Sequence, residues 1–246
     1  QPYDFDFCFP VSDVLENARV KLVPFIVFSN GSFNYCLVSY HPKLYKSVTW
    51  GPFPDLKTHE YVLEKYLRKE AGSVLFAIFD KTRPPAGNGE SGEGAAGTLA
   101  GALGYINSSP KNLCTEIGTL VVLPPFQRTH VASNAVGLLL HYALNSPSHL
   151  AFPGLGLRRV AWLTNRVNTP SIRLAERLRF QREVVRSKKV PPEGKGAEVS
   201  NGKALRDGDP RAQCLGRDSV LLSLCWDDWE GGAREQVDTA MARKAQ

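Results

Sequence analysis

Residues 116–143 read EIGTLVVLPPFQRTHVASNAVGLLLHYA, and this stretch decides the fold. Its first residues are apolar and β-branched, which is typical of a strand, and a short turn with two prolines follows. The turn leads directly into residues 131–144, where apolar side chains recur at the helical period. The side chains on the common face are Val131, Ala135, Leu138, Leu139 and Tyr142. The sequence therefore predicts a strand, a tight turn and an amphipathic helix in direct succession.

A strand that turns straight into a helix points the first backbone N–H groups of the helix at one place. These groups have no partner inside the helix, and the helix dipole favours negative charge at that end. The turn adds Gln127, Arg128 and Thr129 as further donors. The stretch is thus suited to a pyrophosphate, although many α/β proteins contain a strand, a turn and a helix with one arginine.

The flanking sequence alternates between strand and helix patterns. Strands are predicted at residues 19–24, 74–80, 99–106, 116–123, 159–163, 184–190 and 219–226. Helices are predicted at residues 33–40, 56–69, 131–144 and 170–178, and a polar one in the last twenty residues. This order implies an α/β sandwich around a mixed sheet. Residues 82–96 and 191–216 are rich in glycine and proline and are predicted to be exposed loops.

Composition narrows the class of protein. The chain has 246 residues, of which 43% are hydrophobic and 22% charged, so it can bury a sizeable core. The longest apolar runs fall far short of the roughly 20 residues that cross a membrane, and no secretory signal is expected. The five cysteines show no paired spacing, which argues against a disulfide framework and a metal site. The sequence predicts a cytoplasmic protein and leaves the nucleus open.

The net charge of +6 permits an acidic ligand without identifying one. The basic residues do not cluster with aromatic residues, and no nucleic-acid-binding motif is present, so no nucleic-acid partner is expected. No membrane partner is expected either.

Three motifs in the correct order resemble the GNAT superfamily of N-acetyltransferases. The acyl-CoA loop of that family matches Val122-x-Pro124 followed by Gln127-x-x-His130-x-Ala132. The second motif matches Asn168-x-x-Ser171, with Ala175, Glu176, Leu178 and Phe180 following at the family spacing. The closing strand, residues 218–223 with Trp229 after it, is similar to the RimJ/RimL branch, as is WGPFP at residues 50–54. The long loops resemble those of fungal members.

The resemblance covers nearly the whole chain and implies a fold and a domain division. The implied fold is the GNAT fold, an α/β class with a mixed, mostly antiparallel sheet of six to seven strands, splayed between its central strands, with helices on both faces. Residues 18–230 would form the N-acetyltransferase domain with its two long loops. Residues 1–17 would be an N-terminal extension, and residues 231–246 a polar C-terminal tail or helix.

The resemblance also implies a co-substrate, acetyl-CoA, and no metal. The residues that it assigns to acetyl-CoA binding are Leu120, Val121, Val122, Gln127, Arg128, Thr129, His130, Val131, Ala132, Ser133, Asn168 and Ser171. The three strand residues would pair with pantetheine through their backbone, the loop would hold the pyrophosphate, and Asn168 would position pantetheine.

Glu116 is the candidate catalytic base. Regular strand alternation would place it on the same face as Gly118 and Leu120, and its spacing matches the catalytic glutamate of the histone-acetylating branch. A carboxylate partly buried beside an apolar tunnel would have a raised pKa, as a base near neutrality requires. The alternative is an acidic residue at a strand end that is solvated or paired with an arginine.

Ser171 is the candidate acid that protonates the leaving thiolate, by resemblance to the second motif. The alternative is structural, because Asn168-Thr169-Pro170-Ser171 is also a good helix-capping sequence.

His130 departs from the family pattern, which usually has glycine there, and Arg179 also replaces a usual glycine. A side chain at position 130 could crowd the pyrophosphate or donate a hydrogen bond to it. The alternative is a histidine at a helix start that points to solvent.

The implied reaction moves an acetyl group from acetyl-CoA directly to a primary amine, either a protein N-terminus or a small molecule. Trp50, Phe53 and Tyr105 are candidates for the wall of the acceptor site. The competing function is a catalytically inactive acyl-CoA-binding module of the same fold. The expected assembly is a monomer or a homodimer.

Overall fold

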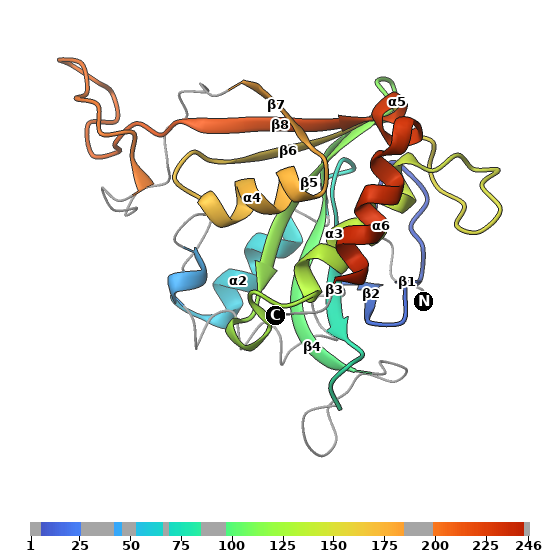
Figure 1. Ribbon diagram of the computed structural model, residues 1–246. Helices are drawn as coiled ribbons and strands as arrows, with labels where there is room; N and C mark the ends of the chain where they lie inside the picture. Colours follow the sequence, from blue (N-terminus) through green and yellow to red (C-terminus); the bar gives the residue numbers. More distant parts are fainter. Residues whose placement is uncertain are drawn as a thin grey trace.

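The centre of the molecule is a β-sheet, which Figure 1 shows. The sheet has eight strands. The computed structural model describes residues 6–25, 42–45, 53–65, 69–84, 97–184 and 199–243. In chain order the strands are β1 (Leu15–Glu16), β2 (Val20–Pro24), β3 (Val74–Asp80), β4 (Thr98–Ser109), β5 (Cys114–Val122), β6 (Arg159–Asn165), β7 (Gln181–Val184) and β8 (Ser219–Cys225). Their order across the sheet is β1-β2-β3-β4-β5-β6-β8-β7.

The sheet divides in the middle. All neighbouring strands are antiparallel except β5 and β6, which are parallel and pair only from Cys114 opposite Arg159 to Glu116 opposite Ala161. Beyond that point the two strands diverge, which Figure 1 shows as an opening between β5 and β6. The expected mixed, mostly antiparallel, splayed sheet is confirmed. It has eight strands rather than six or seven, because the two-residue β1 pairs with β2.

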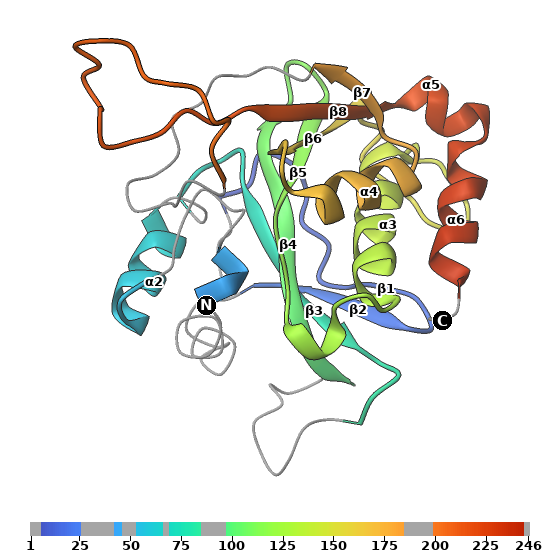
Figure 2. The same ribbon diagram turned by 60° about the vertical axis from the view of Figure 1, so that its left-hand side comes forward.

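Helices cover both faces of the sheet. They are η1 (Pro42–Tyr45), α2 (Leu56–Leu63), η3 (Pro124–Phe126), α3 (Val131–Leu144), α4 (Thr169–Arg177), α5 (Trp226–Asp228), η5 (Trp229–Ala233) and α6 (Arg234–Ala242). Figure 2 shows α2 on one side of β4 and β5, and α3, α4 and α6 on the other. The carboxylate of Asp55 caps α2 by accepting a hydrogen bond from the Thr58 amide at 2.7 Å.

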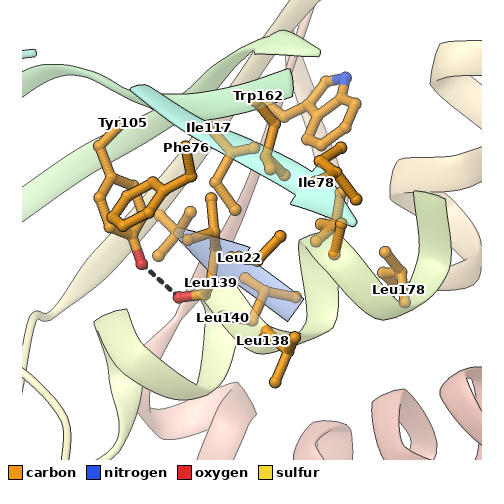
Figure 3. Close-up of a cluster of buried hydrophobic side chains, with 14 of the residues drawn as sticks. Leu22, Phe76, Ile78, Tyr105, Ile117, Leu138, Leu139, Leu140, Trp162 and Leu178 are labelled. Atoms are coloured by element: carbon orange, nitrogen blue, oxygen red, sulfur yellow. Dashed lines mark hydrogen bonds between the residues drawn. The ribbon is translucent and has the colours of Figure 1, made fainter. Parts of the chain in front are cut away.

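The largest part of the core lies between the sheet and α3, as Figure 3 shows. Leu22 of β2, Phe76 and Ile78 of β3 and Ile117 of β5 pack there with Leu139 of α3. The helix is apolar on nearly all sides rather than along one stripe. A helix of this kind must be covered on its outer side as well as on its sheet side.

The C-terminal segment supplies that cover. Trp229 and Val237 are fully buried, and the Trp229 indole donates to the side-chain oxygen of Asn145 at 2.9 Å. Met241 packs on Gly137 of α3 so closely that a Cβ at residue 137 would lie 2.2 Å from the methionine sulfur. The last residues are helical as expected, but the face turned toward α3 is apolar. The expected domain boundaries stay predictions.

Most predicted elements are present with shifted ends. The strand at residues 74–80 and the helix at residues 131–144 have the predicted bounds. The α-helical part of α2 runs to Leu63, and residues 66–68 of the predicted helix lie outside the described residues. The edge strand β7 begins at Gln181, three residues before the predicted start. The expected helix at residues 33–40 lies outside the described residues, as does most of the loop at residues 82–96. Residues 199–216 form an irregular loop. No helix among the described residues has the length and apolar character needed to cross a membrane.

Candidate functional site

The turn between β5 and α3 is held by its own side chains. The Gln127 side-chain amide donates to the carbonyl of Val122 at 3.0 Å. The Thr129 hydroxyl donates to the Phe126 carbonyl at 2.6 Å and accepts a long hydrogen bond from the Val131 amide. These bonds fix the path of the chain from the end of β5 into the helix.

The first turn of α3 presents backbone donors beside an exposed arginine. The first amide of the helix that bonds to a preceding backbone carbonyl is that of Asn134, which donates to His130. The amides of Ala132 and Ser133 precede it and have no partner within the helix. Arg128 is exposed, has a φ of 61°, and makes no ion pair with another described residue. Donors of this kind at one helix end suit an anionic group.

The His130 side chain is directed away from this donor cluster, toward the end of β3. Its Nε2 lies 3.2 Å from a carboxylate oxygen of Asp80, and both side chains are buried. Burial, followed by the charge of Arg19, lowers the pKa of the imidazole below its ordinary value, and Asp80 opposes this shift. The two alternatives considered from the sequence were a phosphate donor and a solvent-facing ring, and neither included this contact.

The edge of β5 beside the opening is irregular at Thr119. This threonine has a φ of 52°, and the pairing of β5 with β4 changes from Gly118 opposite Gly104 to Val121 opposite Ala102. Two residues of β5 thus stand opposite one residue of β4, which defines a β-bulge. Positive φ is rare for a β-branched residue, and bulges are enriched beside active sites.

The bulge corrects one expectation. Gly118 and Val121 stand opposite two residues of β4 that share a face, so Val121, and not Leu120, lies on the face of Glu116. Leu120 is partly buried against the core, as is Val122. Because pairing with β6 ends at Glu116, residues 117–122 have no strand beside them on that edge among the described residues.

Glu116 lies at the last paired position, where β5 and β6 begin to separate. Its side chain is half-buried and accepts a hydrogen bond from the side-chain amide of Asn107 at 2.9 Å. Asn107 has a φ of 52° and belongs to the neighbouring strand β4. The carboxylate is therefore held at the closed end of the opening by an adjacent strand.

Ser171 lies in the first turn of α4, and its contact is not with the helix backbone. The Trp162 indole Nε1 donates to the Ser171 hydroxyl oxygen at 3.0 Å. Asn168, the first boundary residue of α4, makes no side-chain capping bond and instead donates to the Thr164 hydroxyl at 3.1 Å. The capping alternative thus has no hydrogen bond to support it at either residue.

Glu116 and Ser171 belong to opposite faces of the sheet. Glu116 pairs with Ala161, so their side chains share a face, and the next residue of β6, Trp162, points to the other face. Ser171 contacts Trp162 and lies with it. A carboxylate and a hydroxyl therefore flank the opening between β5 and β6 from its two sides.

The three aromatic residues predicted for the acceptor wall are placed differently from one another. Trp50 lies outside the described residues. Phe53 lies shortly before α2. Its ring packs edge-on against the ring of Tyr45, with centres 5.6 Å apart, and against the ring of His59, with centres 4.9 Å apart. Tyr105 is fully buried, its hydroxyl donates to the Leu139 carbonyl of α3, and burial raises the pKa of the phenol. Tyr105 therefore belongs to the core in Figure 3.

Two residues near the site were not singled out from the sequence. The sequence predicts Trp162 only as part of the strand at residues 159–163, although an indole in a strand that precedes a serine-bearing helix start is a signal that could be recognised. Asp80 ends β3, and its carboxylate contacts Thr82 and Arg83 as well as His130. Nothing in the local sequence indicates that this residue would meet the start of α3.

Comparison with known proteins adds a family and a set of similar folds. The model of the acetyltransferase (GNAT) domain matches residues 36–181. A GCN5-related N-acetyltransferase from Brucella melitensis has 21% identity and a TM-score of 0.69, over 95% of this chain and 87% of that one. No protein of curated function matches the sequence.

Two similar structures were solved with CoA compounds. RimJ from Mycobacterium smegmatis, in complex with CoA-disulfide, has 16% identity and a TM-score of 0.62 over 90% of this chain and 88% of that one. Spermidine N-acetyltransferase from Vibrio cholerae, in complex with CoA and spermine, has 12% identity and a TM-score of 0.58 over 87% and 99%. At these identities the likeness shows the fold.

Proposed function

The chain belongs to the acetyltransferase (GNAT) domain family, and we propose that it moves an acetyl group from acetyl-CoA directly to a primary amine. The observation that carries the proposal is the opening between β5 and β6, which begins where Glu116 pairs with Ala161. A carboxylate lies on one side of this opening and a hydroxyl on the other.

The turn before α3 is proposed to bind the pyrophosphate of acetyl-CoA. The support is the pair of amides at Ala132 and Ser133, which have no partner among the described residues, together with the exposed cation of Arg128. Gln127 and Thr129 hold the turn in shape, and the His130 backbone belongs to the same cradle. The first turn of α3 contains no acidic residue of its own that would repel a bound anion.

The unpaired edge of β5 is proposed to bind pantetheine through its backbone. Leu120, Val121 and Val122 follow the bulge, and the bulge breaks the regular ladder at the place where an extended ligand would have to lie. Backbone groups at such an edge need partners, and pantetheine carries two amides that can pair with them. Asn168, at the start of α4 across the opening, is proposed to contact the same chain.

Glu116 and Ser171 are proposed to move the two protons of the reaction. The substrate ammonium gives a proton to Glu116, directly or through water, and the neutral amine forms a bond to the thioester carbon. As the carbon–sulfur bond breaks, the nitrogen loses its second proton to solvent. Ser171 gives its hydroxyl proton to the sulfur and recovers a proton from solvent. Because the two groups lie on opposite sides of the sheet opening, one can serve the attacking nitrogen and the other the leaving sulfur.

The acceptor is proposed to be an amine of low pKa. An α-amino group has a pKa about 2.7 units below that of lysine, which makes its deprotonation at fixed pH easier by roughly 3.7 kcal/mol. With a single candidate base, a protein N-terminus or another weakly basic amine suits the site better than a lysine. The RimJ/RimL branch, the cytoplasmic location and the monomeric or dimeric state stay predictions.

One experiment separates the proposal from its alternative. The melting temperature is measured with and without acetyl-CoA, and CoA release is then followed with a panel of N-terminal peptides and small amines. The proposal expects a raised melting temperature and amine-dependent release. Stabilisation without release on any amine would identify an inactive acyl-CoA-binding module, and no stabilisation at all would contradict both functions.

A further inference from the structure

The hydrogen bond between Trp162 and Ser171 determines how the serine hydroxyl can be used. An indole N–H can only donate, so the Ser171 oxygen must accept in this 3.0 Å bond. One lone pair of the oxygen is thereby occupied and its position is fixed. The hydroxyl proton is left to donate to a different acceptor.

In a helix, the usual acceptor for a serine hydroxyl proton is a backbone carbonyl of the same helix. A serine in a helix often donates back to the carbonyl three or four residues earlier. Among the described residues, Ser171 makes no such bond, and the hydrogen bond of its side chain is the one from Trp162. The tryptophan thus keeps the hydroxyl turned away from its own backbone, with its proton available.

Trp162 is rigidly held. It lies in the middle of β6, paired with Leu222 of β8, and its side chain is 3% exposed. Its ring meets the ring of Phe180 edge-on, with centres 5.6 Å apart. A donor fixed on a central strand and wedged by a second aromatic ring offers a single position to the hydroxyl of α4.

We propose that Trp162 is the positioning residue for the proton donor, setting the Ser171 hydroxyl so that its proton goes to the sulfur that leaves. The inference rests on the proposed function. The indole neither gains nor loses a proton in the step; the proton passes from the Ser171 oxygen to the thiolate, and the serine recovers a proton from solvent. The alternative is a buried indole that merely satisfies its N–H with a nearby hydroxyl.

The test is a cycle of Trp162→Phe, Ser171→Ala and the double variant, measured by steady-state kinetics with one accepted amine. Trp162→Phe removes the N–H donor and keeps an aromatic ring. We expect kcat to fall about three- to tenfold, in keeping with one lost hydrogen bond, and KM for acetyl-CoA to stay within about twofold. In the Ser171→Ala background the same change should have no further effect on kcat.

Two more variants separate positioning from packing. Phe180→Leu disturbs the same aromatic pair but keeps the indole N–H, and should lower the melting temperature while reducing kcat less than Trp162→Phe does. Trp162→His keeps a ring N–H in a smaller side chain and should retain more activity than Trp162→Phe. If the phenylalanine variant does not fold, Trp162→His takes its place in the cycle, and its effect on kcat should disappear in the Ser171→Ala background.

The outcomes distinguish the inference from the proposed function. If Ser171→Ala is slow but Trp162→Phe turns over as wild type does, the positioning role is overturned and the acetyltransferase assignment stands. Losses that multiply in the double variant would also overturn it, because the two residues would then act independently. If Ser171→Ala turns over as wild type does, Ser171 is not the acid and Trp162 does not position one.

Discussion

Glu116 is the side chain whose charge matters most to the proposed reaction, because it would accept the proton of the ammonium. Glu116→Gln keeps the shape and can still accept a hydrogen bond from Asn107, but it cannot take up a proton. Turnover should fall by roughly 10²–10⁴ with little change in acetyl-CoA affinity. The loss should shrink at high pH, where the amine is already neutral in solution.

The matched control is Glu235→Gln, which alters an exposed carboxylate of α6 beside Arg234. Its turnover should equal that of wild type. Wild-type turnover of Glu116→Gln at pH 7 would make Glu116 structural, and the proton would then need another acceptor.

His130 gives a prediction about stability and pH. Its pKa in the folded protein is lowered, first by burial and then by Arg19. The unfolded chain therefore binds a proton that the folded protein does not, and stability is lost as pH falls from about 6.5 through the lower folded pKa. His130→Gln removes this titration and can keep a hydrogen bond to Asp80.

The measurement is the melting temperature of the two proteins between pH 5 and 8. Wild type should lose more stability than His130→Gln on the acid side, and the difference should be constant above about pH 7.5. His59 and His141 also have lowered pKa values, but they are present in both proteins and cancel. A difference that is equal at pH 5 and pH 8 would contradict the assignment.

For single residues, the sequence predicts which residues are candidates for the site better than it predicts which neighbours their side chains contact. Glu116 and Ser171 are candidates by resemblance to family motifs, because the spacing of a motif can be read along the chain. The contacts of His130 with Asp80 and of Ser171 with Trp162 join residues from different elements, and local sequence does not encode such contacts. The bulge at Thr119 could not be foreseen either, since a threonine in a strand normally favours extended backbone.

The start of α3 is the element on which the proposed cofactor contact depends. Arg128→Ala should weaken acetyl-CoA binding by roughly 1.5–3 kcal/mol, which is about ten- to hundredfold, through loss of a charge-assisted hydrogen bond to phosphate. Calorimetry with CoA measures this directly.

Arg179→Ala is a close control for that measurement. Arg179 is another exposed arginine with positive φ, 70° against 61° for Arg128, and it follows α4 instead of preceding α3. Backbone effects should therefore be similar in the two variants, and only Arg128→Ala should change the affinity. If Arg128→Ala and Arg179→Ala bind CoA with equal affinity, Arg128 does not contact the phosphates.

At the element scale, periodicity predicted most strands and helices because burial imposes it. The helix at residues 131–144 has its predicted length. It is not buried along one face only, as an amphipathic pattern predicts, since nearly all of its side chains are buried. The strand β1 was missed because two residues cannot show a period. The divergence of β5 and β6 was inferred by resemblance, because no local pattern reports where two distant strands stop pairing.

For the whole molecule, the packing of the C-terminal segment on α3 predicts that two tryptophans three residues apart contribute very differently to the stability of the fold. Trp229 is fully buried and bonded to Asn145, whereas Trp226 is 48% exposed. Trp229→Ala should cost about 3–5 kcal/mol and lower the melting temperature by about 6–20 °C for a protein of this size.

Trp226→Ala is the internal control and should change the melting temperature by only a degree or two. Thermal unfolding followed by circular dichroism compares the variants under one condition. Similar melting temperatures for the two would mean that the C-terminal segment does not stabilise the domain.

Because the segment that covers α3 comes at the C-terminal end of the described chain, α3 is synthesised before its cover. Ribosomal synthesis proceeds at roughly 5–20 residues per second, and α3 is translated well before β8 and the segment from Trp226 to Ala242. During that interval the helix has its apolar outer side without the partner that later buries it. A nascent chain at this stage offers a binding site to chaperones, and a chain that stops before α6 keeps an exposed, aggregation-prone helix instead of becoming a smaller version of the same molecule.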